Sequence, residues 1–305
     1  MNIFLKRVVT GVGAGALALG LFSAGVVAQQ DYSKVTIKTT KLGDNVYMMT
    51  GTGGNLGVSV GEDGVFLIDD QFAPLTKKIQ DAIGKLSKKP IRFVINTHWH
   101  FDHTGGNENL GKAGSIIVAH DNVRQRMSTD QFIKAFNKKV PATAKVGLPS
   151  VTFSETTTFH LNNDTIAVSH VPTAHTDGDS FIHFKKANVI HSGDMFFNGF
   201  YPFIDTSSKG SIEGVIKGAE TMLALADDKT KIIPGHGPLA DKAALTKYRD
   251  MLKDVRASVK ALVDQGKSRD EAIAAKPTAK LDAEWGKGFL KPDVFVGIVY
   301  DSLKK

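Results

Sequence analysis

Three histidines and one aspartate fall within six consecutive positions of the chain. The segment 98–103 reads HWHFDH and directly follows an apolar run. A single histidine is usually structural, but three imidazoles around a carboxylate indicate a common purpose, and metal ligation is the obvious one. At the end of a strand, His98 and His100 project to the same side, whereas Asp102 and His103 turn with the loop and can face a second position.

Three further candidate ligands, His175, Asp194 and His236, each lie at a transition from strand to loop. Each one alone is more typical of a turn, because Asp-Gly and Gly-Asp steps are ordinary turn sequences. Together with the four candidates of segment 98–103 they form a set of seven ligands, enough for two metal ions in adjacent sites. We expect the remaining histidines to be structural: His120, His160, His170, His183 and His191.

The composition limits how a metal could be held and which partners the protein has. The chain has 305 residues and no cysteine, which excludes disulfides, thiolate zinc sites, iron–sulfur clusters and a cysteine nucleophile. With 42% hydrophobic and 23% charged residues, it has the composition of a folded globular protein. The net charge of +7 is mild and no basic patch accompanies it, so we expect no nucleic-acid partner.

The elements that must position these ligands alternate between strands and helices. Apolar or β-branched runs predict strands at 45–49, 56–60, 65–68, 91–96, 165–171, 181–190 (with a hairpin turn at 185–188) and 231–233. Helical spacing predicts helices at 74–86, 123–136, 211–226, 243–265, 269–275 and 292–303, with a loop-like stretch after 136. This order indicates a mixed α/β class built on sheet layers.

Residues 1–28 differ from the rest of the chain. Lys6 and Arg7 precede an uncharged stretch, 8–27, and the segment ends in small residues at Ala28. This pattern is typical of a signal peptide cleaved near Ala28. An uncleaved membrane anchor is the alternative, because the apolar run approaches membrane-spanning length. We therefore expect a periplasmic or secreted protein with no stable membrane association after cleavage.

The order and intervals of the candidate ligands resemble those of the metallo-β-lactamase fold superfamily, over about residues 46–237. The resemblance implies an α/β fold, a four-layer αββα sandwich with metals along one edge. We expect this domain at residues 29–240, with a helical C-terminal extension, 241–305, packed on it. Asp69, at the end of a predicted strand, matches an acidic residue that supports the site. The implied first zinc site is His98, His100 and His175; the second is Asp102, His103 and His236; and Asp194 bridges both.

The implied activity is hydrolysis of a small-molecule substrate with two Zn²⁺ ions per chain. A metal-bridging hydroxide would attack a carbonyl, with Asp102 and Asp194 as the catalytic residues. A cyclic amide or ester, such as a β-lactam, is the first interpretation. However, the commonest β-lactamases of the family use a cysteine ligand that this chain lacks.

Other activities stay open. The segment around Asp194 is more like glyoxalase II and its relatives, which makes a lactonase or thioesterase the alternative. A mononuclear iron persulfide dioxygenase is an alternative of a different class, and a complete set of seven ligands argues against it. A metal-loaded binding protein without turnover is a third possibility. Aromatic residues cluster in sequence around the ligands, and an apolar or aromatic acyl substrate would follow if they faced the metals.

Overall fold

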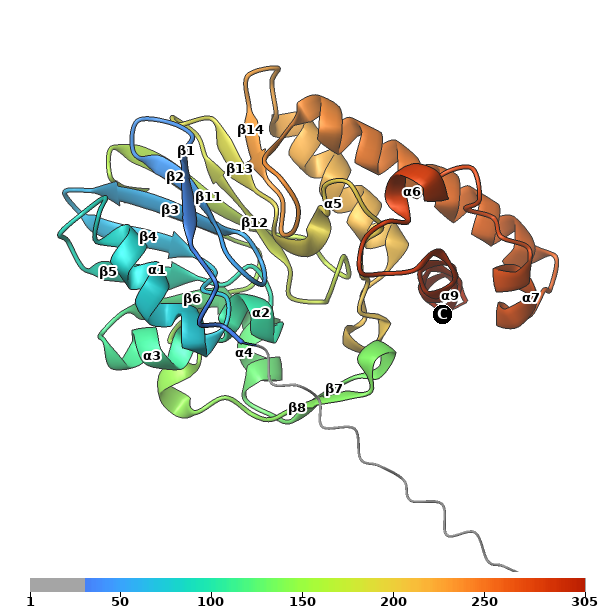
Figure 1. Ribbon diagram of the computed structural model, residues 1–305, viewed down its shortest axis with the longest axis horizontal. Helices are drawn as coiled ribbons and strands as arrows, with labels where there is room; N and C mark the ends of the chain where they lie inside the picture. The colour runs from blue at the N-terminus through green and yellow to red at the C-terminus, as the bar shows by residue number, and fades with distance from the viewer. Residues whose placement is uncertain (1–30, 305) are drawn as a thin grey trace, which may run out of the picture. The chain divides into compact units, whose positions relative to one another are not determined.

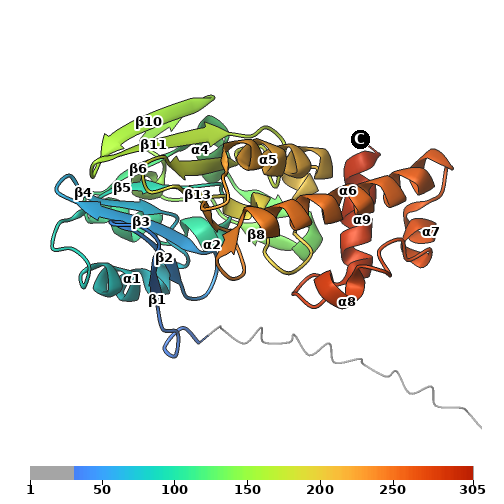
Figure 2. The same cartoon turned by 90° about the horizontal axis from the view of Figure 1, so that it is seen from above.

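Two β-sheets pack face to face at the centre of the protein, which is described here from a computed structural model of residues 31–304 (Figures 1 and 2). The predicted signal peptide, residues 1–28, lies outside the described residues. The first sheet has the order β1-β2-β3-β4-β5-β6-β9, antiparallel up to β4 and parallel from there. Its strands are β1 (Lys38–Lys41), β2 (Val46–Thr50), β3 (Leu56–Gly61), β4 (Gly64–Ile68), β5 (Ile91–Ile95), β6 (Ile116–His120) and β9 (Val151–Phe153).

The second sheet has the order β10-β11-β12-β13-β14-β15, antiparallel except for the parallel pair β13 and β14. A separate hairpin, β7 and β8, completes the described strands. The strands are β7 (Gln131–Ile133), β8 (Lys138–Val140), β10 (Thr156–Leu161), β11 (Asp164–His170), β12 (Ser180–Phe184), β13 (Val189–His191), β14 (Lys231–Ile233) and β15 (Ala240–Asp241).

Helices cover the outer faces of both sheets. The α-helices are α1 (Thr76–Ile83), α2 (Phe101–Thr104), α3 (Asn107–Lys112), α4 (Asp121–Met127), α5 (Ile212–Leu225), α6 (Lys242–Asp264), α7 (Arg269–Ala274), α8 (Asp282–Trp285) and α9 (Pro292–Leu303). Short 3₁₀ helices are η1 (Ala73–Leu75), η2 (Lys134–Phe136), η3 (Lys145–Gly147), η4 (Gly193–Met195) and η5 (Thr206–Ser208). No helix among residues 31–304 is long and apolar enough to cross a membrane.

The period of two along the strands explains the layers. In β4, Phe66 and Ile68 belong to the core between the sheets, whereas Val65 and Leu67 belong to the core shared with α1. In β12, Ile182 faces the core between the sheets, whereas its neighbour Phe181 belongs to the core under α5 and α6. Because every layer is bound to the next by its own apolar cluster, the αββα sandwich implied by the resemblance is confirmed.

The C-terminal helices share a continuous apolar core with the rest of the molecule. Tyr248 of α6, Trp285 of α8 and Phe295 of α9 are buried in the same cluster as Phe196 and Ile190. Helix α6 packs against α5 and α9, and these helices lie together in orange and red in Figure 1. The predicted boundary after residue 240 stays a prediction, although a helical C-terminal region is present.

The predicted helix at 123–136 is wrong in its second half. Helix α4 ends at Met127, and the chain then forms the hairpin β7–β8, in which Gln131 pairs with Val140. Two features favour this outcome. The sequence Ser-Thr-Asp at 128–130 is turn-forming, and Asn137 adopts a left-handed backbone (φ +48°) that asparagine tolerates better than most residues. The other predicted helices and strands are present, with bounds shifted by a few residues.

Strand ends bring the candidate ligands to one edge. Strand β5 ends at Ile95, shortly before segment 98–103, and the parallel strands β13 and β14 end together at His191 and Ile233. Asp194 and His236 follow these two strand ends by three residues each. Since the parallel strands β13 and β14 present their carboxyl ends at the same edge of the second sheet, Asp194 and His236 meet there, and the end of β5 brings segment 98–103 to them from the first sheet.

Candidate metal centre

All seven predicted ligands lie together at this edge, in two groups. Within each group the potential ligand atoms are within 4.8 Å of one another. The first group is His98, His100, His175 and Asp194, and the second is Asp102, His103 and His236. The structure therefore brings together the whole predicted set.

The first group has three imidazole nitrogens aimed at one point. His100 Nδ1 lies 3.2 Å from His98 Nε2 and 2.8 Å from His175 Nε2. Asp194 Oδ2 is 3.8 Å and 3.5 Å from the same two Nε2 atoms. Two nitrogens bound to a tetrahedral ion at about 2.0–2.1 Å lie roughly 3.3 Å apart, so these separations fit ligands of one small cation.

The opposite nitrogens of these rings each have an acceptor, which fixes the tautomers. His175 Nδ1 lies 2.7 Å from the Phe203 carbonyl oxygen, and His100 Nε2 lies 3.1 Å from Asp205 Oδ2. Both acceptors can only receive a hydrogen bond, so each outer nitrogen donates its N–H and the inner nitrogen keeps a lone pair. Lone pairs that face one another at these distances call for a cation between them.

Thr97 fixes the tautomer of His98 in a similar way. Its hydroxyl donates to Asp69 Oδ2 at 2.8 Å and therefore accepts from His98 Nδ1 at 3.0 Å. His98 Nε2 then carries a lone pair. Burial lowers the pKa of His98 well below its usual value and that of His175 to about 4, so both rings are neutral at neutral pH, as metal ligation requires.

The ligand atoms of the second group are similarly close to one another, and Asp194 links them to the first group. His103 Nε2 lies 3.3 Å from His236 Nε2, and Asp102 Oδ2 lies 3.7 Å and 3.4 Å from these two nitrogens. Asp194 connects the groups, because its Oδ1 is 3.1 Å from His103 Nε2 and its Oδ2 is 3.4 Å from His236 Nε2. One carboxylate thus lies between both sets of ligands.

The electrostatics of the second group favour a bound cation. Burial acts to lower the pKa of His103 and of His236, but Asp194 and Asp102 outweigh it. The pKa of His103 rises well above its usual value and that of His236 rises to about 9. Asp194 Oδ1 is buried and accepts no hydrogen bond of good geometry, despite its nearness to His103. An orphaned carboxylate oxygen among histidines fits a metal ligand.

Asp69 supports both groups from outside. Its Oδ2 accepts from His103 Nδ1 at 2.7 Å and from the Thr97 hydroxyl, and its Oδ1 accepts from the Thr97 backbone N–H at 2.8 Å. The predicted supporting position of Asp69 is therefore confirmed as a contact. Glycines let the chain close around the site: a Cβ on Gly54 would lie 2.1 Å from the His103 ring, and one on Gly235 would lie 2.0 Å from Asp194 Oδ1.

Sequence reasoning missed Asp205 and Thr97. Asp205 accepts from Ser207 N–H at 3.0 Å and from the Ser208 hydroxyl at 2.6 Å, so it orders its own turn as well as His100. An Asp before two serines is typical of an ordinary turn, and no spacing relates it to a histidine 105 residues away. Only the folded chain shows the pairing.

The remaining histidines lie outside both groups. His120 stacks on His170 with ring centroids 3.6 Å apart, and His191 Nε2 lies 3.0 Å from the Asn55 carbonyl oxygen. His160 and His183 lie on β10 and β12. Their absence from the ligand groups agrees with the structural role expected of them.

A pocket of about 220 Å³ opens onto the ligand groups. Its polar lining consists of His100, Asp102, Asp194 and His236. Asp102 and His236 are each 21% exposed, so the second group is the side of the centre that a substrate can reach. The apolar wall is made by six phenylalanines and one isoleucine: Phe72, Phe101, Ile133, Phe136, Phe197, Phe203 and Phe289.

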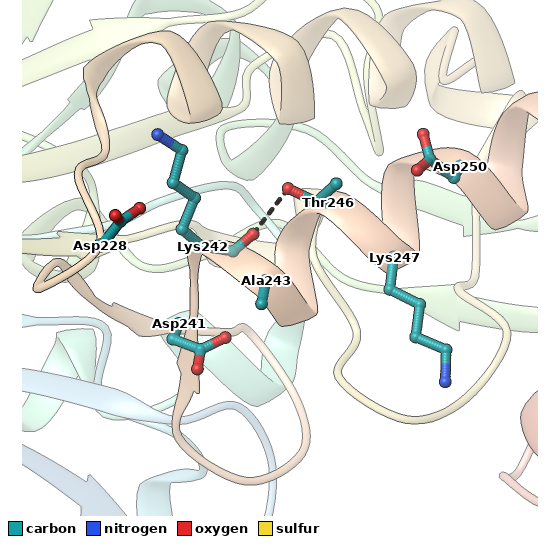
Figure 3. A pocket seen from close by; sticks show the side chains of 7 residues that line it. All are labelled: Asp228, Asp241, Lys242, Ala243, Thr246, Lys247 and Asp250. Carbon is teal, nitrogen blue, oxygen red and sulfur yellow. Dashed lines mark hydrogen bonds between the residues drawn. The ribbon is translucent and has the colours of Figure 1, made fainter.

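A larger hollow of about 620 Å³ lies at the start of α6 and contains none of the seven clustered residues (Figure 3). Asp241, Asp250, Lys242 and Lys247 line it, and the two lysine side chains point away from each other. The one hydrogen bond drawn there joins the Thr246 hydroxyl to the Lys242 carbonyl oxygen, at 2.8 Å within the helix. Despite its larger volume, this hollow has no cluster of side chains that point toward a common binding position.

The family comparison agrees with the geometry. The sequence model of the metallo-beta-lactamase superfamily matches residues 49–241, more than half of the chain. The chain belongs to the metallo-β-lactamase superfamily. All seven clustered residues lie within the matched segment.

Two curated relatives are hydrolases of this superfamily. The chain is 27% identical over 215 residues to a hydroxyacylglutathione hydrolase of Polaromonas sp. (strain JS666 / ATCC BAA-500), which covers 70% of this chain and 72% of that protein. It is 23% identical over 227 residues to a metallo-beta-lactamase type 2 of Bacillus cereus, covering 72% and 83%.

Solved structures show the same fold. The metallo-beta-lactamase from Pontibacter korlensis aligns with a TM-score of 0.59 at 20% identity, covering 72% of this chain and all of that one (100%). The sec-alkylsulfatase Pisa1 from Pseudomonas sp. aligns with a TM-score of 0.65 at 18% identity, covering 87% of this chain and 50% of that one. The superfamily member described here is thus a metal-dependent hydrolase that acts on a small molecule and binds a divalent metal.

Proposed function

We propose that the protein is an exported dinuclear zinc hydrolase that opens a cyclic amide or ester, such as a β-lactam, with a lactonase or thioesterase as the alternative. The observation that carries this proposal is the position of Asp194 between two complete ligand groups. Nitrogen and carboxylate donors without cysteine suit zinc, and the first group would hold one ion and the second group the other. The N-terminal pattern of residues 1–28 supports export to the periplasm or beyond.

Bound divalent ions would supply a water of lowered pKa and an electrophile for the carbonyl oxygen of the substrate. The chain itself contributes the rest. Asp102, 21% exposed at the pocket, is placed to orient the attacking water and to accept its proton. Asp194, 5% exposed, keeps the two groups at a fixed separation, and Asp69, Thr97 and Asp205 hold the histidine rings in the ligating tautomer.

Thioester hydrolysis is the second candidate, and a specific observation favours it. The sequence around Asp194, Gly-Asp-Met-Phe at 193–196, is similar to that of glyoxalase II and its relatives. The relatives include a hydroxyacylglutathione hydrolase and an acyl-coenzyme A thioesterase of Homo sapiens. The mononuclear iron persulfide dioxygenase is disfavoured because the second group of ligands is complete.

A hydrolysis panel with and without chelator tests the proposal. The panel contains a chromogenic cephalosporin, a lactone, a thioester and a phosphodiester, and metal content is measured on the same preparation. We expect chelator-sensitive opening of the cephalosporin or the lactone, restored by zinc. Turnover of the thioester alone would select the second candidate. One iron per chain with oxygen consumption in the presence of a persulfide would overturn hydrolysis altogether.

A further inference from the structure

The pocket beside the metal centre is apolar apart from the metal ligands themselves. Every polar side chain that lines it belongs to the two ligand groups, and every other lining side chain is aromatic or aliphatic. Its volume of about 220 Å³ lies below the roughly 300–1,000 Å³ of most ligand pockets. The space therefore suits a compact apolar group attached to one hydrolysable bond.

The inner wall is preorganised. Phe197 and Phe203 are 1% and 4% exposed. Phe197 stacks on the His236 ring with centroids 5.1 Å apart, and Phe203 stacks on the His100 ring at 5.9 Å. These two rings place apolar surface directly beside one histidine of each ligand group. An acyl group bound at the metal centre would lie against them without any rearrangement.

The rim is formed by two phenylalanines from distant parts of the chain. Phe136 lies in the turn of the β7–β8 hairpin and Phe289 lies between α8 and α9; they are 44% and 57% exposed. Each touches the inner wall, because Phe136 is 4.6 Å from Phe203 and Phe289 is 6.2 Å from Phe197 between ring centroids. Their exposed surface would be covered by a substrate that fills the pocket.

Nothing in the lining would neutralise a charged substrate group away from the metal centre. The lining includes no lysine or arginine. The Lys138 ammonium lies 3.2 Å from the centroid of the Phe101 ring and interacts electrostatically with Asp102, so this cation is already paired with groups of the site although it does not line the pocket. A carboxylate on the far side of the substrate would face phenylalanine rings instead of a cation, and its desolvation would be uncompensated.

We propose that the pocket selects an ester, lactone or amide whose acyl group is compact and apolar, and rejects the same acyl group when it ends in a carboxylate. This inference rests on the proposed hydrolytic function. In the reaction, the oxygen of one water forms a bond to the acyl carbon, the bond from that carbon to oxygen or nitrogen breaks, and the alcohol or amine takes up a proton; an open-chain substrate gives two products, and a ring gives one molecule that carries both groups.

Two esters that differ at one end test the selectivity. 4-Nitrophenyl butyrate and mono-4-nitrophenyl succinate share a leaving group and chain length, but one ends in a methyl group and the other in a carboxylate. We expect the chelator-sensitive kcat/KM itself, after subtraction of the uncatalysed rate, to be at least about 30-fold higher for the butyrate. From acetate to butyrate it should rise about 3- to 4-fold for each added methylene. Equal rates, or a preference for the succinate, would overturn the proposal.

Binding of matched ketones separates failure of this inference from failure of the proposed function. Butyrophenone and 4-oxo-4-phenylbutanoate cannot be hydrolysed and differ in the same way as the two esters. If neither ester is cleaved, the hydrolytic proposal fails for esters, yet metal-loaded protein should still bind the neutral ketone at least about tenfold more tightly. Equal affinity for the two ketones would refute the pocket selectivity itself.

Rim variants provide the structural control. Phe136→Ala and Phe289→Ala should each lower kcat/KM for the butyrate about tenfold and for the acetate much less. Phe132→Ala is the matched control, because Phe132 is 47% exposed on the same hairpin but does not line the pocket. Phe289→Lys should shift the preference toward the succinate. A Phe132→Ala effect as large as that of Phe136→Ala would contradict the assignment of the rim.

Discussion

Asp69 Oδ2 lies 2.7 Å from His103 Nδ1, and through this contact one buried carboxylate sets the orientation of a ligand in the second metal group. The same oxygen accepts from Thr97, which in turn accepts from His98 of the first group. Asp69, which directly follows β4, therefore orients one ligand of each group: His103 directly and His98 through Thr97. Neither contact involves the pocket, so their loss would act through the ligands.

Replacing Asp69 should weaken both metal sites. In Asp69→Ala, His103 loses its acceptor and Thr97 loses the partner that directs its hydroxyl. We expect metal affinity and activity to fall about 10- to 100-fold. Competition with a chromogenic chelator measures the affinity. Asp70→Asn is the control, because Asp70 is the buried neighbour of Asp69 but its Oδ1 accepts from the Gly106 backbone N–H at 2.8 Å. Equal losses in both variants would remove the special role of Asp69.

For metal binding by the first group, the hydroxyl of Thr97 should matter more than the volume of its side chain. Thr97→Val keeps the volume but removes the acceptor for His98 Nδ1, whereas Thr97→Ser keeps the hydroxyl. We expect about tenfold weaker metal binding in the valine variant and near-normal binding in the serine variant. The two affinities are compared by the same chelator competition. Similar affinities in valine and serine variants would show that the tautomer of His98 is set in another way.

Gly54 should tolerate no side chain. A Cβ at this position would lie 2.1 Å from His103 Cε1 and 2.5 Å from both ring nitrogens, far inside van der Waals contact. The Gly54→Ala protein should shift His103 and lose metal from the second group, with a stability cost of about 1–3 kcal/mol from overpacking. Metal content and thermal unfolding measure the two effects. Unchanged metal content would mean that the loop at 51–54 can move aside freely.

The start of α7 should give a pH-dependent contribution to stability. Glu271 accepts from Ser268 N–H at 2.8 Å in a capping box, and the backbone bond and the Ser268 hydroxyl lower its pKa to about 2. Since the folded pKa is depressed below the ordinary value of 4.5, this stabilisation is present above pH 4.5 and lost as the pH falls toward 2. The melting temperature of Glu271→Gln should lie below that of wild type at pH 7 and approach it at pH 3. A constant difference across this range would contradict the ionic cap.

The sequence predicted the metal ligands better than it predicted the residues that orient those ligands. His, Asp and spacing identify chemistry directly, so all seven ligands could be named before the fold was known. Asp205, the hydrogen-bond partner of His100, could not be predicted, because this contact forms only when the folded chain brings together two residues that are 105 positions apart. Likewise, helical spacing favoured a helix through Phe136, yet local turn chemistry at 128–130 and Asn137 produced a hairpin that supplies part of the pocket rim.

The layered fold came from the resemblance, since periodicity distinguishes a buried face from an exposed one but does not say which faces meet. Strands at 151–153 and 156–161 were not predicted. The second is rich in threonine and alternates between exposed and half-buried residues at the sheet edge, where burial leaves little apolar signal. Each of these edge strands depends on pairing with a neighbour, β9 with β6 and β10 with β11, and this contact is absent from the local sequence.

Each of the two groups of ligands should hold one metal ion. Metal analysis by plasma mass spectrometry of the purified protein and of the double variant His98→Ala, His100→Ala tests it most directly. His160→Ala serves as the control, since His160 lies on β10 outside both groups. We predict two zinc ions per chain in wild type and control, and one in the double variant together with loss of hydrolysis. A single iron in wild type, or two metals and full activity in the double variant, would contradict the account.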